Sequence, residues 1–172
     1  LEAEAPVESN RLAKLVANCW GLQKVMQNRV DLILNFIPRD HLTRTPFGDY
    51  VWSTPSQAQS WTEYRPSGPT AERQLHEIAP KEFTNALVDL VDRSVSKEDA
   101  TRALASIFGF GRLTKKVRGH VEAIIDYAIQ TGVLSIDGEA RLRIASPSQS
   151  VGETRPPGSP GRTQAGRRHG PV

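Results

Sequence analysis

The sequence of 172 residues contains one cysteine and one methionine, and it has no run of roughly eighteen apolar residues, the length that spans a bilayer. Without a second cysteine, no disulfide can form within the chain. The neighbours of Cys19, in "ANCWG", are apolar and predict a buried small hydrophobic side chain rather than a reactive thiol. No signal-peptide pattern is visible either, so we expect a cytoplasmic protein.

Acidic side chains are scarce in residues 146–172, which hold four arginines and one glutamate and so equal the net charge of +3 of the whole chain. Residues 1–145 are therefore neutral overall, and any attraction to phosphates must come from local clustering. Residues 146–172 are also rich in proline, glycine and serine. Such a segment buries too little apolar surface to offset its chain entropy, so we predict a disordered basic tail.

The residue patterns of common catalytic and metal sites are missing. The stretch "GFGRLTKK" lacks the spacing of a phosphate-binding loop, and no G-x-G-x-x-G occurs. The four histidines are far apart, and a single cysteine cannot build a zinc site. No set of nucleophile, base and orienting residue is recognisable. The sequence therefore predicts no catalysis, no cofactor and no bound metal.

Residues 80–145 have the pattern of three helices followed by a β-hairpin. Helices are predicted to begin at Pro80, after the capping residue Ser96 and near Thr114, each with apolar residues at helical spacing. The alternating segment 133–144 predicts two strands joined by a tight turn at Asp137-Gly138. Four aliphatic side chains are expected on the inner face of this hairpin: Leu134, Ile136, Leu142 and Ile144. This order of elements is typical of a winged helix.

Residues 1–52 repeat this pattern incompletely, at an offset of 88 residues. Trp20-Gly21 then aligns with Phe108-Gly109, and a hairpin is expected around Phe47-Gly48-Asp49. The opening helix of the pattern is missing, and the chain starts at Leu1 rather than methionine, which suggests a fragment cut from a longer protein.

We therefore predict a mainly α fold (α+β) made of tandem winged-helix-like domains, each of helices plus a β-hairpin. The first repeat, 1–52, is N-terminally truncated. An extended linker, 53–79, follows, in which Trp61 and Tyr64 are expected to pack against one neighbouring domain rather than to stack on bases. The second repeat, 80–145, is complete, and the disordered tail covers 146–172.

Basic side chains gather where the last helix of the second repeat begins. The candidate nucleic-acid contacts there are Arg112, Thr114, Lys115, Lys116, Arg118 and His120. In helix-turn-helix proteins this end of the helix enters the major groove, and such cations can bind phosphates. The alternative is a solvated basic surface of a small domain, and both interpretations stand. In the first repeat the corresponding candidates are Lys24 and Arg29, where the lower charge favours a solvated face.

Four segments carry a resemblance to a known family: "PVESNRLAKLVANCWGLQKVMQNRVDLILNFIPRD", "YVW", "LHEIAPKEFTNALVDLV" and "SIFGFGRLTKKVRGHVEAIIDYAIQTGVL". Over residues 5–145 the chain resembles an uncharacterised bacterial domain that typically closes very large multidomain proteins. The other parts of those proteins are a superfamily 1 DNA helicase and a restriction-endonuclease-like nuclease. The resemblance implies a role beside DNA unwinding or cleavage, with upstream helicase and nuclease domains as partners, and it transfers no catalytic residue.

The function expected from these observations is that of a non-catalytic accessory module of a helicase–nuclease. Such a module would bind DNA, duplex or forked, through its winged-helix repeats. The alternative is a protein-interaction or scaffold module that docks on the helicase motor or on another partner.

Overall fold

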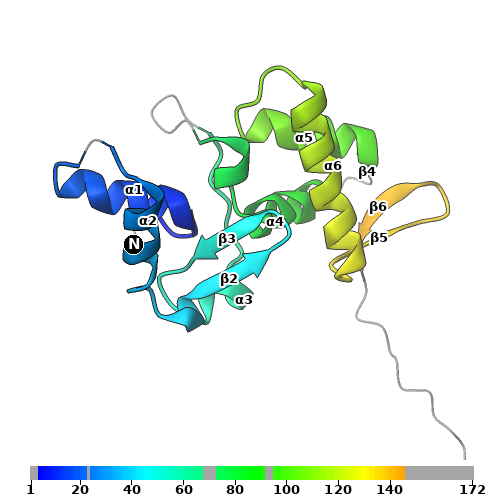
Figure 1. The fold of residues 1–172 in the computed structure, drawn as a ribbon. Helices are drawn as coiled ribbons and strands as arrows, with labels where there is room; N and C mark the ends of the chain where they lie inside the picture. The colour runs from blue at the N-terminus through cyan, green and yellow to red at the C-terminus, as the bar shows by residue number, and fades with distance from the viewer. Residues whose placement is uncertain (1–3, 23, 68–72, 92–94, 146–172) are drawn as a thin grey trace, which may run out of the picture.

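The structure, a computed structural model, describes residues 4–22, 24–67, 73–91 and 95–145 and shows a mixed helix-and-strand fold of the α+β class (Figure 1). These described ranges contain six α-helices and two small antiparallel sheets of three strands each. None of the helices in this part of the chain combines the length and the apolar character needed to cross a membrane. The predicted tail, 146–172, lies outside the described residues.

The first half of the chain, residues 4–52, places two short helices beside one sheet. Its elements are β1 (Val7–Glu8), α1 (Ser9–Cys19), α2 (Gln27–Leu34), the 3-10 turn η1 (Arg39–His41), β2 (Leu42–Thr45) and β3 (Gly48–Val51). Strand β3 lies between β1 and β2. The Glu8 carboxylate accepts the backbone N–H groups of Asn10 and Arg11 at 3.1 and 2.8 Å. An acidic side chain therefore caps α1, where the helix dipole favours negative charge.

The second half, residues 80–145, has one further helix. Its elements are α4 (Pro80–Val91), β4 (Val95–Ser96), α5 (Lys97–Ile107), α6 (Lys115–Gln130), β5 (Leu134–Ile136) and β6 (Arg141–Ile144), with β6 between β4 and β5. The predicted helix starts are confirmed. The hydroxyl of Ser96 accepts the N–H of Asp99 at 3.1 Å, and that of Thr114 accepts the N–H of Val117 at 3.3 Å.

The predicted apolar stripes form one core in the second half. Its most buried side chains come from α4, α5, α6 and the hairpin, and they include Phe83, Leu87, Leu104, Phe108, Val121, Ile124, Ile125, Leu134 and Leu142. Three helices thus bury their apolar faces against one another and against one face of the β4-β6-β5 sheet.

The two halves share element boundaries at an offset of 88 residues. Helices α1 and α5 begin and end at corresponding positions, as do β1 and β4, and α2 begins where α6 does. Helices α1 and α5 are each followed by a glycine in the left-handed conformation, Gly21 with φ 76° and Gly109 with φ 81°. In each case the next residue donates its N–H back to an alanine carbonyl, from Leu22 at 3.0 Å and from Phe110 at 2.7 Å. This is the hydrogen bond of a Schellman-type helix end.

The segment between the halves, residues 53–79, is not simply extended. It contains the short helix α3 (Gln57–Ser60) and the 3-10 turn η2 (Leu75–Glu77). Trp61 packs edge-on against Trp52 of the first half, with ring centroids 6.1 Å apart, and Tyr64 packs against Phe108 of the second half at 6.3 Å. The aromatic side chains therefore pack as predicted, but against both halves rather than one.

Three local predictions differ from the structure. The β5–β6 loop is longer than a two-residue turn, because Ala140 donates its N–H to the carbonyl of Asp137 and takes the positive φ of 58° itself. The hairpin predicted around Phe47-Gly48-Asp49 is confirmed between β2 and β3, but its turn lies at Pro46-Phe47 because Gly48 already pairs with Thr45 in the ladder. Cys19 is exposed, since no described segment covers that side of α1.

The inner face of the second hairpin is only partly buried. Leu134 and Leu142 are buried in the core, whereas Ile136 and Ile144 are about half exposed. All four side chains share one face of the sheet, because Leu134 pairs with Ile144 and Ile136 pairs with Leu142. The hairpin therefore extends beyond the helices that it packs against.

Candidate nucleic-acid interface and a buried carboxylate

The start of α6 presents an exposed group of cations. Arg112, Lys115 and Lys116, which we call the basic tip, are all exposed, and Thr114 between them caps the helix. Within the described residues, none of these three side chains forms an ion pair. The backbone N–H groups of the first turn point out of the N-terminal end of α6. The basic tip therefore combines the charges of its side chains with the positive end of the helix dipole.

Farther along α6, cations are matched by acids. Arg118 lies 3.6 Å from Glu122, one helical turn later, and Asp126 accepts a hydrogen bond from Lys97 of α5 at 2.5 Å. Arg102 of α5 pairs with Glu98 at 2.5 Å. These exposed pairs leave little net positive charge beyond the first turn of α6. On α5 and α6, the surplus of positive charge is thus confined to the basic tip.

His120 lies apart from the exposed tip, in the contact between α6 and the first half. Its ring meets Phe47 edge-on at a centroid distance of 5.4 Å, and Phe47 also contacts Tyr127 at 5.7 Å. Phe47 sits in the turn of the β2–β3 hairpin, so this hairpin of the first half packs against α6 of the second half (Figure 1). The side of α6 that carries His120 and Tyr127 is therefore covered.

Burial lowers the pKa of His120, and the neighbouring His76 and Lys116 lower it further. The Nε2 atom of His120 is buried and has no hydrogen-bond partner among the described residues. Protonation would place a charged N–H in this apolar contact without an acceptor, which is the physical cause of the shift.

The free energy of unfolding is expected to fall as the pH is lowered below the usual imidazole pKa of 6.5. In that range the unfolded His120 takes up a proton while the folded one resists, so acid favours the unfolded state. The measurement is urea-induced unfolding from neutral pH to about pH 5. The His120→Gln variant should show a weaker pH dependence than the wild type, and identical curves for the two proteins would contradict this assignment.

The candidates in the first half do not join this group. Lys24 and Arg29 are exposed on the segment that leads into α2 and on α2 itself. Figure 1 shows α2 and α6 on opposite sides of the β2–β3 hairpin. The structure therefore brings together the basic tip and separates it from Lys24 and Arg29.

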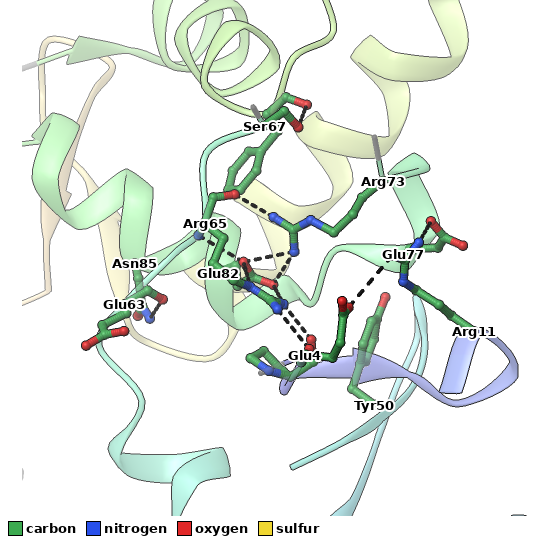
Figure 2. Close-up of polar contacts among 12 residues, drawn as sticks. Glu4, Arg11, Tyr50, Glu63, Arg65, Ser67, Arg73, Glu77, Glu82 and Asn85 are labelled. Atoms are coloured by element: carbon green, nitrogen blue, oxygen red, sulfur yellow. Dashed lines mark hydrogen bonds and ion pairs between the residues drawn. The ribbon is translucent and has the colours of Figure 1, made fainter. Parts of the chain in front are cut away.

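A second charged group, which sequence reasoning missed, is buried between the halves (Figure 2). Glu82 of α4 is completely buried and accepts hydrogen bonds from two arginines. Arg65 reaches it through its backbone N–H at 3.0 Å, its Nε at 3.2 Å and its Nη2 at 2.8 Å. Arg73 donates from Nη1 to both carboxylate oxygens at 2.7 and 3.1 Å. We call these three residues the Glu82 cluster.

The Glu82 cluster ties the N-terminal segment to α4. Arg65 also donates to the carbonyl oxygens of Glu4 at 2.8 Å and Pro6 at 2.6 Å. A carboxylate that already accepts five hydrogen bonds from two arginines has little capacity left to accept a hydrogen bond from a substrate. The cluster is therefore suited to holding segments together and unsuited to acid–base catalysis.

Two further polar contacts in the same region join the first half to the turn η2 of the connecting segment. The Tyr50 hydroxyl donates to the carbonyl oxygen of His76 at 3.0 Å, and Arg11 pairs with Glu77 at 3.1 Å. Burial, with the nearby Glu8 and Glu82 carboxylates, raises the pKa of Tyr50, so its hydroxyl remains a donor.

A cavity of about 210 Å³ lies between the β2–β3 hairpin and helices α4 and α6. Its lining is mostly apolar and includes Tyr50, Trp52, Pro80 and Tyr127. Among the described residues that line it there is no aspartate, glutamate, histidine or cysteine that could bind a metal. Comparison with protein-family models, with curated protein sequences and with solved structures gives no match to this chain.

Proposed function

We propose that this chain is a non-catalytic accessory module of a helicase–nuclease and that it binds duplex or forked DNA through winged-helix-like repeats. Two features of the fold support the winged-helix interpretation. The second half has the order helix, strand, helix, helix, strand, strand with the sheet order β4-β6-β5, and the first half has the same order from its first strand onward. In such folds the last helix and the hairpin contact nucleic acid.

The observation that carries the proposal is the basic tip. Arg112, Lys115 and Lys116 are exposed and unpaired within the described residues, and they surround the N-terminus of the helix that corresponds to a recognition helix. Lysine and arginine side chains beside a helix N-terminus form a favourable site for phosphate oxygens. Residues 1–145 are neutral in sum with the basic tip included, so this surplus of positive charge is local.

The shape of the site favours contact with the DNA backbone over base reading. Phe47 and its hairpin cover the side of α6 at His120 and Tyr127, and the exposed side carries Glu122 and Asp126 beyond the first turn. Acidic side chains in a groove would repel phosphates and match few base edges. We therefore expect binding that depends strongly on salt and weakly on base sequence.

The test is to replace Arg112, Lys115 and Lys116 together with alanine and to measure binding to duplex and forked DNA against salt. The affinity is expected to fall roughly 10- to 100-fold, and the slope of log association constant against log salt should flatten by up to about 3, since each lost phosphate contact removes about 0.9.

The matched control removes three exposed cations of the first half that are not candidate nucleic-acid contacts, Lys14, Arg39 and Arg44. It changes the net charge by the same amount, so any effect of total charge alone is shared by both variants. The control should bind DNA within about threefold of the wild type. Equal losses in the two variants, or an unchanged affinity and slope after loss of the basic tip, would remove the proposal.

A protein-interaction or scaffold function is the second candidate. The observation that favours it is a set of large apolar side chains exposed on α1 and α2, including Trp20 and Phe36. Surfaces of this kind commonly mark protein interaction sites. If the basic-tip variant retains full DNA binding while this apolar surface binds a partner, the scaffold function is the correct one.

A further inference from the structure

The α1–α2 side of the first half exposes side chains that a folded domain normally buries. Trp20, at the end of α1, is 72% exposed, and Phe36, just after α2, is 82% exposed. Leu32 of α2 is 58% exposed. We call these three residues the apolar face.

The residues of the second half that correspond to the apolar face are buried. At the offset of 88 residues, Trp20 corresponds to Phe108, which is 1% exposed, and Phe36 corresponds to Ile124, which is 0% exposed. The comparison is closest at Trp20, because α1 and α5 share both boundaries and the same glycine-terminated end, whereas Phe36 lies just after α2 and Ile124 lies within α6. Equivalent positions are therefore buried in one half and open in the other.

Helix α4 covers these positions in the second half. Its Phe83 packs on the ring of Phe108 at a centroid distance of 4.4 Å and also faces His120 at 6.3 Å. Phe108 and His120 are the counterparts of Trp20 and Leu32 at the offset of 88 residues. The described part of the first half contains no helix in the place that α4 occupies in the second.

We propose that the apolar face binds an amphipathic helix of the α4 type, contributed by a partner polypeptide. The helix would place one aromatic side chain between Trp20 and Leu32, as Phe83 lies between their counterparts. An aliphatic side chain one turn later, in the position of Leu87 on α4, would cover Phe36. This is the helix-in-groove mode of recognition, with anchors at positions i, i+4 and i+7 or i+8.

The size and charge of the face fit a single helix. Since a large side chain buries about 150–250 Å², the apolar face offers on the order of 500 Å². A standard interface between two folded proteins uses about 800 Å² from each partner, so a second copy of the whole chain is a poorer match. Arg29 lies three residues before Leu32 on the same side of α2 and is exposed. The partner helix is therefore expected to carry an acidic residue at the end that meets Arg29.

The probe is a synthetic, end-capped peptide with the sequence of residues 79–91, "APKEFTNALVDLV", because α4 is the helix known to cover the equivalent surface. Fluorescence anisotropy of the labelled peptide with the full chain should show saturable binding. Binding should also shift the Trp20 emission to shorter wavelength as water leaves the indole, and this shift should vanish in Trp20→Phe while binding persists.

The deciding variant is Phe36→Ser in the protein, with Leu87→Ser in the peptide as the matched change on the other side. Each should weaken binding about tenfold or more, as expected for a central apolar anchor. Because Phe36 is exposed, the variant should keep the thermal midpoint and the circular dichroism of the wild type. It also leaves the basic tip intact, so DNA binding should be unchanged and the two proposals are tested separately.

Two outcomes would overturn this proposal. One is the absence of saturable peptide binding, or binding that Phe36→Ser does not weaken. The other is self-association of the chain that Phe36→Ser abolishes in sedimentation experiments, which would make a second copy the occupant of the face.

Discussion

Replacing Glu82 with glutamine is expected to lower the free energy of unfolding by about 3–5 kcal/mol, the usual cost of breaking a buried ion pair by removing one partner. The amide keeps the size of the carboxylate, so little packing is lost. It removes the negative charge, however, and leaves Arg65 and Arg73 facing each other, with the Arg73 side chain only 7% exposed. One amide oxygen also cannot accept the hydrogen bonds that two carboxylate oxygens accept.

The measurement is equilibrium denaturation by urea, with Glu98→Gln as the matched control. Glu98 also pairs with an arginine, Arg102, but both side chains are more than half exposed. An exposed pair within one helix is worth only about 0.3–0.5 kcal/mol, so the control should unfold almost as the wild type does. If Glu82→Gln were as stable as the control, the Glu82 cluster would have no role in holding the segments together.

The second large effect is expected at Phe108. Phe108→Ala should lower the free energy of unfolding by about 3–5 kcal/mol, since truncation of a buried phenylalanine loses its transfer free energy and leaves a cavity. The ring of Phe108 packs against that of Phe83 of α4, with centroids 4.4 Å apart, and against that of Tyr64 of the connecting segment, with centroids 6.3 Å apart. Its removal therefore loosens the helical core and the chain that crosses it.

The matched variant is Trp20→Ala, at the corresponding position of the first half. A larger side chain is removed there, yet the change should stay within about 0.5 kcal/mol because Trp20 is mainly in water. Thermal and urea unfolding of both variants provide the comparison. Equal losses at the two positions would show that the halves bury these residues alike, contrary to the structure.

Much of the second half could be predicted from the sequence, because its signals are local. Ser96 and Thr114 are strong helix-capping residues, and Gly109 can adopt the left-handed conformation that ends α5. Gly109 is needed for a second reason that the sequence does not reveal. A Cβ at this position would lie 2.6 Å from the Cβ of Ser67, whose segment crosses the helix end.

The missed features depend on contacts between distant residues. Strands β1 and β4 are two residues long, too short for any alternating pattern, and exist only because β3 and β6 lie beside them. Glu82 follows Pro80 in the first turn of α4, where an acidic residue is usually a solvated partner of the helix dipole. Only the return of Arg65 and Arg73 shows that it is buried.

The candidate site could be predicted in part for the same reason. The exposure of Lys115 and Lys116 follows from their spacing off the apolar stripe of α6. The contact of His120 with Phe47 does not, because it requires the first hairpin to reach the second half. No property of either residue alone signals that contact.

The bonds from Arg65 to the carbonyl oxygens of Glu4 and Pro6 have a consequence for the order in which the chain acquires its shape during synthesis. The segment 4–8 leaves the ribosome before α4 does, yet the arginine that fastens it is held by a carboxylate at position 82. Residues 4–8 therefore cannot be secured by the Glu82 cluster until α4 has been translated. We expect the nascent first half to remain open to proteases until that point, and to become resistant as the second half emerges.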